Sequence, residues 1–328
     1  MGSGSQDIIN KAVVNIFNPG EPILVETPVY AGVIPMFTSL GLNVIPVPTD
    51  GEGIDADELE RILAGWGEEK GRKPKALYTV PYGCNPTGMT ASLSRRLKVL
   101  QLARKHDFLI LEDDPYFYLY FGDRARPASY FSLDNPQDEG WDGNRVLRFD
   151  SLSKILSSGI RIGWLTGPPT LVTAIERHTA TANLQTPTLT QSIIYKLLDR
   201  WGYEGFLEHT RRVSGFYRTK RDVFDDALVK HFGPNGNGGK ASWVRPEAGM
   251  FYWFRMEGIE DASDFVREKA FEEGVLALPG DAFLPSAGPK SPYVRAAFSI
   301  PTDVEIDLAL GRLRAAYDAF VVSQDKII

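Results

Sequence analysis

The sequence predicts an α/β protein with a mostly parallel, mixed sheet flanked by helices, followed by a smaller α+β domain. Short apolar strands alternate with helical segments as far as about residue 169. Polar clusters follow the ends of several of these strands, which is where ligands bind in parallel sheets. Beyond Pro169, successive helices replace the alternation, and a region of mixed helices and strands comes last. We therefore expect a large domain over residues 1–204 and a small domain over residues 205–328.

The large domain is expected to alternate strands with helices from its first residues. Apolar residues recur with helical period over 7–17, and Asp55 suits the N-cap of a helix over 55–66. A third helix is expected over 93–106. The apolar runs that predict strands lie at 23–26, 43–47, 76–80, 108–111, 146–149 and 162–166.

The second half of the chain is richer in helices. The helix over 206–232 is long enough to connect the two domains. Further helices are expected at 171–182, 188–201, 262–273 and 304–321, with a strand region over 242–254 and short strands at 275–278 and 293–298.

Composition excludes several classes of function. The chain has 328 residues and a formal net charge of −6, so a nucleic acid is not expected as a partner. No apolar run reaches the ~18–20 residues that a membrane span requires. The single cysteine, Cys84, allows no internal disulfide, which fits a reducing compartment such as the cytoplasm. The four histidines lie far apart and predict no metal site.

The strand at 146–149 leads into the residues with the strongest chemical signal. Ser151, Ser153 and Lys154 follow it directly, and Arg161 comes seven residues after the lysine. Hydroxyls and a guanidinium suit a phosphate, and a neutral lysine amine can form a Schiff base with an aldehyde. The group therefore predicts a phosphorylated aldehyde cofactor bound through Lys154. The alternative is that Lys154 is an ordinary solvated lysine.

The first six residues are open to two interpretations. Met1 to Gln6 is not a signal peptide, because no apolar core follows a basic start. A Gly-Ser stretch of this kind can be a cloning scar. It also precedes a helix, and a Gly/Ser turn at a helix N-terminus is an anion site. We expect Ser5 and Gln6 to bind the same phosphate.

Three further candidates follow strands of the large domain. Asp113 can form a salt bridge with a protonated ring nitrogen, which keeps a pyridinium ring a good electron sink. Asp114 is a rival for this role, and the alternative is that Asp113 belongs to an ordinary turn. Tyr116 and Asn85 can hydrogen-bond a phenolic oxygen of the cofactor. Asn85 also opens an Asn-Pro pair, which is common in ordinary turns.

Two more residues complete the set of candidates. Tyr30 can stack on the ring face of the cofactor, or it can belong to the core. Arg295 lies within an apolar strand, where a charge needs a partner. A substrate carboxylate or an internal salt bridge would satisfy it.

Taken together, these residues resemble the aspartate-aminotransferase superfamily, fold type I of the pyridoxal-phosphate enzymes. The motifs that carry the resemblance come in the family's order: Asn85-Pro86-Thr87-Gly88, Asp113-x-x-Tyr116, Ser151-x-Ser153-Lys154, Arg161 and Arg295. Three stretches resemble the branch of aromatic, kynurenine and 2-aminoadipate aminotransferases: residues 112–116, 157–163 and 246–251.

The resemblance implies a role for each candidate. Lys154 would attach pyridoxal 5'-phosphate, Asp113 would pair with its ring nitrogen, and Tyr30 would stack on the ring. Asn85 and Tyr116 would bond the ring oxygen, and Arg295, with Asn85 near it, would anchor the substrate carboxylate. The residues implied for the phosphate are Ser5, Gln6, Ser151, Ser153 and Arg161.

The activity implied is transamination of an aromatic amino acid, kynurenine or 2-aminoadipate, with 2-oxoglutarate as the acceptor. A cytoplasmic homodimer is implied as well. Family members carry a segment before the Gly4-Ser5-Gln6 turn that is expected to be missing here, and this segment contributes to the small domain and to the partner's site. The alternatives are a lyase of the same fold, a ligand-sensing module of a transcription regulator, and a pseudoenzyme.

Overall fold

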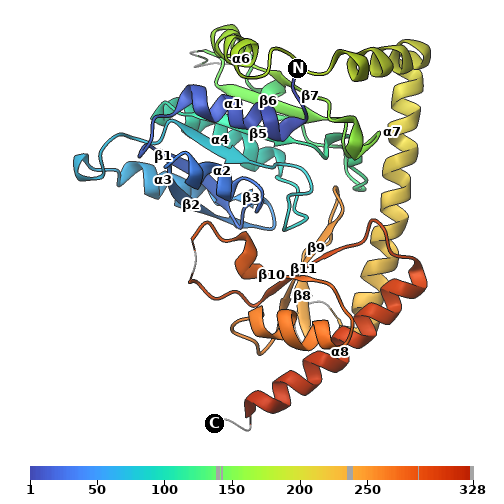
Figure 1. Ribbon diagram of the computed structural model, residues 1–328. Helices are drawn as coiled ribbons and strands as arrows, with labels where there is room; N and C mark the ends of the chain where they lie inside the picture. Colours follow the sequence, from blue (N-terminus) through green and yellow to red (C-terminus); the bar gives the residue numbers. More distant parts are fainter. Residues whose placement is uncertain (138–140, 142, 235–238, 287, 326–328) are drawn as a thin grey trace.

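The computed structural model describes residues 1–137, 141, 143–234, 239–286 and 288–325, and it contains two β-sheets (Figure 1). The larger sheet has seven strands in the order β3-β2-β1-β4-β5-β6-β7. Pairing is parallel from β2 to β6, while β3 and β7 run antiparallel at the two edges. The prediction of a mostly parallel, mixed sheet is therefore confirmed. The strands are β1 (Pro22–Thr27), β2 (Asn43–Asp50), β3 (Gly53–Ile54), β4 (Ala76–Thr79), β5 (Leu109–Asp114), β6 (Val146–Ser151) and β7 (Gly163–Thr166).

Helices cover both faces of this sheet (Figure 1). In β1, Ile23 and Val25 pack into the core beside α1, whereas Leu24 packs into the core beside α3 and α4. Successive strand residues point to opposite faces, so a strand buried on both sides reads as one continuous apolar run. The helices of this part are α1 (Ser5–Ile16), α2 (Ile34–Ser39), α3 (Ala56–Ala64), α4 (Leu93–His106), α5 (Tyr130–Leu133) and α6 (Pro169–Ala182).

The predicted cap of α3 is confirmed. The Asp55 side chain accepts hydrogen bonds from the backbone N–H groups of Asp57 and Glu58, both at 3.0 Å. Since the first N–H groups of a helix have no partner inside it, this carboxylate stabilises the start of α3 by about 1 kcal/mol.

The two helices predicted at 188–201 and 206–232 form one kinked element, α7 (Thr188–Phe232). Only Gly202 departs from helical geometry, with φ 61° and ψ −172°. Glycine reaches positive φ without steric cost, so one residue is enough to turn the helix. The predicted break over 202–205 was too long, because the chain resumes helical hydrogen bonding directly after the glycine. Beyond the kink, α7 runs from the large sheet to the small one (Figure 1).

The smaller sheet is antiparallel, with the strand order β10-β11-β9-β8. Its elements are β8 (Ala241–Trp243), β9 (Phe251–Met256), β10 (Leu278–Pro279), β11 (Tyr293–Ala297) and the last helix, α8 (Asp303–Asp325). The helix predicted over 262–273 contains wider, π-type turns at Phe265–Ala270. We propose to keep the domain boundary at residues 204 and 205, next to the kink of α7.

Two stretches of the small domain differ from the predicted extent of their strands. The strand region expected over 242–254 holds β8 and the start of β9, and its middle leaves the small sheet and contacts the large domain. There the Phe121 N–H donates to the Glu247 carbonyl at 2.8 Å, and the Gly249 N–H donates to the Leu119 carbonyl at 3.2 Å. The strand expected over 275–278 shrinks to its last residue, because the Val275 N–H closes the preceding helix by donating to the Ala270 carbonyl.

The same crossing segment meets the turn after β4 at very short range. Gly83 and Gly249 both have positive φ, 51° and 78°. A Cβ at Gly83 would lie 2.4 Å from the backbone carbon of Ala248, and a Cβ at Gly249 would lie 2.7 Å from the Gly83 carbonyl oxygen. Only glycine lets the two backbones come this close.

Among the helices of the described residues, none has an apolar stretch long enough to cross a lipid bilayer.

Candidate functional site

The predicted site residues meet at one edge of the large sheet. Tyr30 follows β1, Asn85 follows β4, Asp113 lies at the end of β5, and Ser151 closes β6. Because β1, β4, β5 and β6 are parallel, their carboxyl ends share this edge. These four residues come from four separate stretches of sequence, and the topology brings them together.

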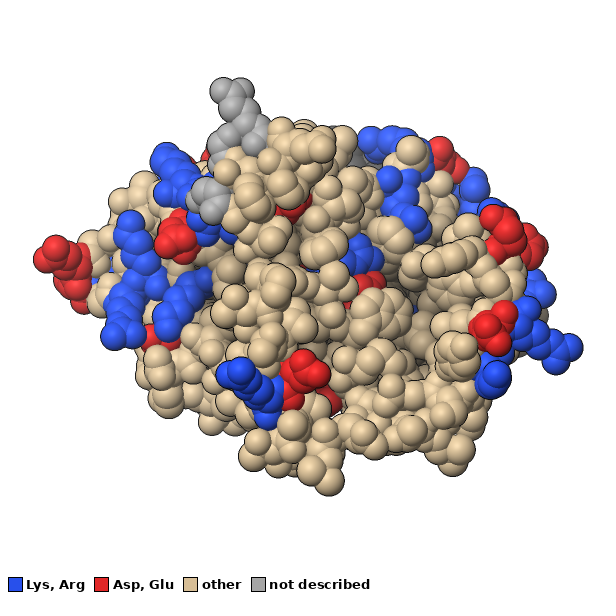
Figure 2. Space-filling view, turned by 90° about the horizontal axis from the view of Figure 1, so that it is seen from above, with Lys and Arg blue, Asp and Glu red and all other residues tan. Residues whose placement is uncertain are grey.

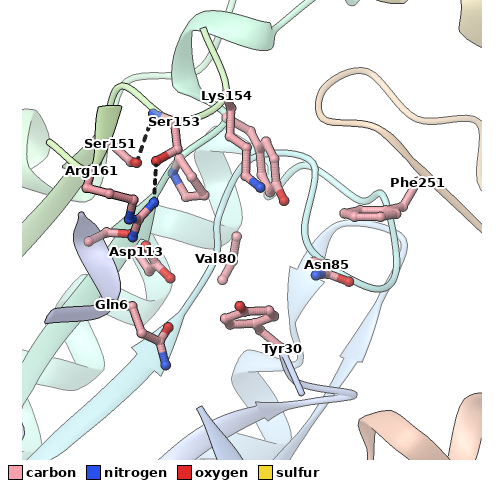
Figure 3. A pocket seen from close by; sticks show the side chains of 13 residues that line it. Gln6, Tyr30, Val80, Asn85, Asp113, Ser151, Ser153, Lys154, Arg161 and Phe251 are labelled. Atoms are coloured by element: carbon pink, nitrogen blue, oxygen red, sulfur yellow. Dashed lines mark hydrogen bonds between the residues drawn. The ribbon is translucent and has the colours of Figure 1, made fainter. Parts of the chain in front are cut away.

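These side chains line a cavity of about 250 Å³ (Figure 3). Every predicted site residue lines it except Arg295, which reaches the cavity through Asn85. Seen from above, charged side chains of both signs lie mostly around the periphery, and acidic and basic atoms appear at the bottom of a central hollow (Figure 2). The lining residues are Ser5, Gln6, Tyr30, Val80, Asn85, Asp113, Pro115, Tyr116, Ser151, Ser153, Lys154, Arg161 and Phe251.

One end of the cavity is built from anion-binding groups. Arg161 Nη1 donates to Ser153 Oγ and to the Ser158 carbonyl, both at 3.1 Å, and Nη2 donates to the Ser3 carbonyl at 3.2 Å. Helix α1 starts at Ser5, so its first N–H groups face the same end. Figure 3 shows Arg161, Ser151, Ser153 and Gln6 together there.

Met1 to Gln6 is held in the fold by backbone contacts. The Gly2 N–H donates to the Gly163 carbonyl at 3.0 Å, and the Gly163 N–H donates back at 3.2 Å. At Gly4 φ is +89°, and a Cβ there would lie 2.2 Å from Arg161 Nη2. The turn before α1 therefore requires a glycine, because a side chain would displace the guanidinium.

Lys154 projects into the middle of the cavity (Figure 3). Burial lowers the pKa of its amine, and the positive charge of Arg161 lowers it further, while Asp113 acts in the opposite direction. A larger fraction of the amine is therefore neutral than in a solvated lysine. A neutral amine is the form that attacks a carbonyl.

Asp113 is the buried carboxylate that faces the cavity. Tyr78 Oη donates to Oδ2 at 2.6 Å, and within the described residues Oδ1 has no hydrogen-bond partner. Burial raises the pKa of Asp113 to about 7, against the lowering effect of the Tyr78 hydrogen bond. Buried polar atoms normally have a hydrogen-bond partner, so this oxygen is suited to accept from a bound group. The rival, Asp114, does not line the cavity and pairs with Arg148 at 2.9 Å.

Arg295 lies beside the opposite end of the cavity. Its Nη1 donates to Asn85 Oδ1 at 3.0 Å, and its guanidinium lies over the rings of Phe251 and Phe283, at 4.4 and 5.0 Å from their centroids. In the described part of the chain it forms no ion pair with a carboxylate, and its buried Nε has no hydrogen-bond partner. The internal salt bridge, weighed as an alternative, is absent from these residues.

The comparison with protein families decides which class this site belongs to. The family model described as aminotransferase class I and II matches residues 1–313, which is most of the chain.

The chain belongs to the class I and II aminotransferases.

Similar proteins support this family membership. The kynurenine/alpha-aminoadipate aminotransferase, mitochondrial, of Bos taurus is 42% identical over 315 residues, which is 94% of this chain and 71% of that protein. The crystal structure of the Pyrococcus horikoshii kynurenine aminotransferase, in complex with PMP, superposes with a TM-score of 0.86 at 31% identity. The superposition covers 97% of this chain and 74% of the Pyrococcus chain.

A third relative bears on the cofactor. LysN, the alpha-aminoadipate aminotransferase of Thermus thermophilus, superposes with a TM-score of 0.84 at 30% identity, over 98% of this chain and 77% of that one. It was solved with N-(5'-phosphopyridoxyl)-L-leucine. The predicted family, the fold type and the enzymatic nature of the chain are confirmed, and the cofactor of this aminotransferase class is pyridoxal 5'-phosphate.

The residues of this aminotransferase fit that cofactor by their own chemistry. The unpaired Oδ1 of Asp113 offers an acceptor for a protonated ring nitrogen. At one end, the cluster around Arg161 offers donors for a phosphate, and Lys154 offers an amine between the two. Ring, phosphate and aldehyde each meet a complementary group.

Several residues of this site were not among the predicted candidates. Val80, Pro115 and Phe251 line the cavity, and Tyr78 holds Asp113 from behind. Val80 and Pro115 lie at or just after the ends of predicted strands, so the sequence could have indicated them as part of the site. Two other aromatic residues, Tyr82 and Tyr252, are fully buried in the core and do not line the cavity.

A second buried carboxylate lies behind the cavity. Glu26, at the end of β1, accepts hydrogen bonds from Thr79 Oγ1 and the Val80 N–H, both at 2.7 Å, and from Cys84 Sγ at 3.3 Å. Burial raises its pKa from 4.5 to about 7, although these three hydrogen bonds lower it. The folded aminotransferase therefore holds a proton here that the unfolded chain releases above pH 4.5.

We expect Glu26→Gln to change how stability depends on pH. Where the folded state binds the extra proton, the free energy of unfolding falls as pH rises. The shift at Glu26 corresponds to a loss of about 3 kcal/mol between pH 4.5 and 7. In the variant this loss disappears, so the difference in stability between variant and wild type grows across that range. Urea denaturation of the cofactor-free protein at pH 5 to 8 measures it.

Glu21→Gln is the matched control for this measurement. A hydrogen bond from Lys75 is the main cause that lowers the pKa of Glu21, to about 2. Its contribution to stability is present above pH 4.5 and is lost as pH falls toward 2, below the range tested. This variant should follow the wild-type slope. Parallel curves for wild type and Glu26→Gln would contradict the assignment of a raised pKa.

Proposed function

We propose that this aminotransferase transfers the amino group of a large amino acid, an aromatic amino acid, kynurenine or 2-aminoadipate, to 2-oxoglutarate. One observation carries the proposal: a guanidinium with an unpaired Nε, Arg295, lies directly beside an aromatic wall, Phe251. Such a pair suits a substrate with a carboxylate next to a bulky side chain. The names of the bovine and Pyrococcus relatives support this substrate class.

The proposed phosphate site is the end of the cavity at the start of α1. Ser151, Ser153 and Arg161 would supply side-chain donors, and Ser5 and Gln6 would supply backbone N–H groups. The Gln6 side chain is already engaged, because Nε2 donates to the Gly32 carbonyl at 2.8 Å. That bond leaves the backbone of Gln6 as the part available to an anion.

The proposed ring site lies between Asp113 and Tyr30. Asp113 would pair with the ring nitrogen through Oδ1, and Tyr30, which is half-buried, would lie against the ring face. Asn85 and Tyr116 would bond the ring oxygen. Because Asn85 Oδ1 accepts from Arg295, its Nδ2 is the group free to donate. When bound, pyridoxal phosphate supplies an electron sink for bond breaking at the substrate α-carbon.

Lys154 has two proposed tasks in this scheme. Its amine would attach the cofactor covalently, and once released it would carry a proton to and from the α-carbon of the substrate. Arg295 would orient both the donor and the acceptor by the carboxylate that they share. The same residues would therefore serve both half-reactions.

An amino-donor panel tests the proposed substrate class. The purified protein, supplied with pyridoxal 5'-phosphate, is given each amino acid with 2-oxoglutarate, and both glutamate and the new oxo acid are quantified. We expect equimolar products, with the highest kcat/KM for tyrosine, phenylalanine, kynurenine or 2-aminoadipate. A preference for small donors such as alanine would overturn the substrate class, and ammonia release without glutamate would indicate a lyase.

A homodimer is proposed from the apolar surface around the first half of α7. Leu184, Leu189, Ile193, Tyr195 and Tyr203 are all more than half exposed within residues 184–203. Exposed large apolar side chains concentrated in one segment are typical of a protein interface. A second copy of the chain would cover them, as closed symmetric dimers commonly do. Sedimentation measures the mass of each protein in solution: we expect a dimer for the wild type and a monomer for Leu189→Glu. A monomeric wild type would refute the dimer.

The proposed location is the cytoplasm, on the evidence of a single, fully buried cysteine, Cys84. The bovine relative is named mitochondrial. Fractionation of the source cells decides between these compartments.

A further inference from the structure

One side chain of the connecting helix contacts the turn that carries Lys154. His209 Nε2 lies 2.6 Å from the carbonyl oxygen of Ile155, the residue that follows the lysine. Helix α7 otherwise passes this edge of the large sheet on its way to the small sheet (Figure 1). The contact joins residues 54 positions apart in the sequence.

The turn after β6 leaves this carbonyl in need of a donor. Leu152 accepts from the N–H groups of both Ile155 and Leu156, at 3.3 and 2.9 Å, which closes a single helical turn. No backbone N–H of the described residues donates to the Ile155 carbonyl. The last carbonyls of a helical turn have no partner within it, and a histidine is one of the side chains that can satisfy them.

The surroundings of His209 fix which ring nitrogen carries the hydrogen. Arg212 Nη2 lies 3.4 Å from Nδ1, and a guanidinium can only donate. Nδ1 must therefore accept, so Nε2 carries the hydrogen and donates to the Ile155 carbonyl. Each ring nitrogen of His209 thus has a partner.

The ring of His209 also packs against a residue on the other side of the kink of α7. Trp201 lies just before Gly202, and its ring centroid is 4.8 Å from that of His209 with the planes inclined by 30°. The imidazole therefore contacts the segment before the kink, belongs to the segment after it, and bonds the turn of Lys154.

We propose that His209 is a positioning residue for Lys154: its hydrogen bond to Ile155 fixes the lysine turn and ties the connecting helix to it. The inference rests on the proposed role of Lys154. Without the bond, the turn can rotate its last peptide groups, and the amine samples positions in which it no longer meets the cofactor. The consequence is weaker cofactor attachment, with no change in the substrate groups.

Two variants separate the hydrogen bond from the ring contact. His209→Phe keeps a ring against Trp201 and removes the donor. His209→Gln keeps an N–H donor at a similar reach and removes the ring. A neutral hydrogen bond is worth about three- to tenfold in an equilibrium constant. We expect His209→Phe to weaken pyridoxal 5'-phosphate binding by about that factor, with kcat reduced and donor KM unchanged, and His209→Gln to restore most of the loss.

The control is His231→Gln, on the same helix but bonded to Asp307 in the small domain at 2.8 Å. Cofactor affinity is measured by absorbance titration of the apo protein. Hydrogen exchange of the peptide covering residues 151–161 is measured without cofactor, and it should be faster in His209→Phe alone. Wild-type affinity and exchange in His209→Phe would overturn the proposal, as would equal losses in His209→Gln or in His231→Gln.

Failure of the proposed function would look different. Reduction with borohydride and peptide mapping of the wild type locates the cofactor. An adduct on another lysine would refute the proposed role of Lys154, whatever the His209 variants do in the exchange experiment. The two ideas therefore fail separately.

Discussion

Lys154→Ala is expected to abolish transamination, with a loss of about 10⁴-fold or more in kcat. The substitution removes the amine that would attach the cofactor and the base that would move the α-proton, and a positioned general base alone contributes about 10²–10⁴-fold. The phosphate donors around Arg161 stay in place, so the variant should still bind pyridoxal 5'-phosphate without a covalent link. Activity with a cognate donor and mass spectrometry after borohydride reduction measure the two effects.

Lys11→Ala serves as the matched control for the loss of an amine. Lys11 is a buried lysine of the same domain, on α1, and pairs with Asp7 at 3.0 Å outside the cavity. It should lose stability but keep the reduced adduct on Lys154. Wild-type-like turnover in Lys154→Ala would refute the assignment of this lysine, and so would an adduct that survives the substitution.

Asp113→Asn is expected to lower kcat by at least about 10²-fold, the cost of removing one preorganised charge from a reacting centre. An amide can still accept the Tyr78 hydroxyl at Oδ2's position, so the fold around it should be kept. It cannot hold a proton on a ring nitrogen, because it carries no charge. The KM of the donor should change far less, since Arg295 and Asn85 are untouched.

The comparison for this variant is Asp225→Asn in the small domain. Asp225 also accepts a tyrosine hydroxyl, from Tyr252 at 2.9 Å, but it lies outside the cavity. It should keep kcat close to wild type. The absorption spectrum of the bound cofactor gives a second readout, because only the Asp113 variant should shift its dependence on pH. Equal kcat in Asp113→Asn and wild type would disprove the pairing.

The arrangement of the large domain followed from patterns that act locally. A run such as 22–25 is apolar because both faces of β1 are covered, and the cap at Asp55 depends on neighbours two and three residues away. The site residues were recognisable because parallel strands end at one edge, so polar residues just after apolar runs converge there. Lys154, Ser153 and Arg161 needed no tertiary information, since they lie within nine consecutive residues.

Two features missed from the sequence depend on partners far away in the chain. Tyr78 reaches Asp113 because β4 and β5 are paired in one register, and nothing near Tyr78 in the sequence indicates this. The strand region predicted over 242–254 is interrupted because its middle is hydrogen-bonded to residues 119–121 of the other domain. The kink at Gly202 was predicted as a gap, since a glycine pattern cannot distinguish one turned residue from a short loop.

The close approach of Gly83 and Gly249 has a consequence for anyone who wants to redesign substrate preference. Asn85 sits two residues after the first glycine, and Phe251 sits two residues after the second. The two backbones are in direct contact, so a change in the path of one requires a matching change in the other. Exchanging only one of these two stretches would therefore disturb their packing. Chimeras should transplant residues 83–88 and 247–251 from the same donor enzyme as one cassette.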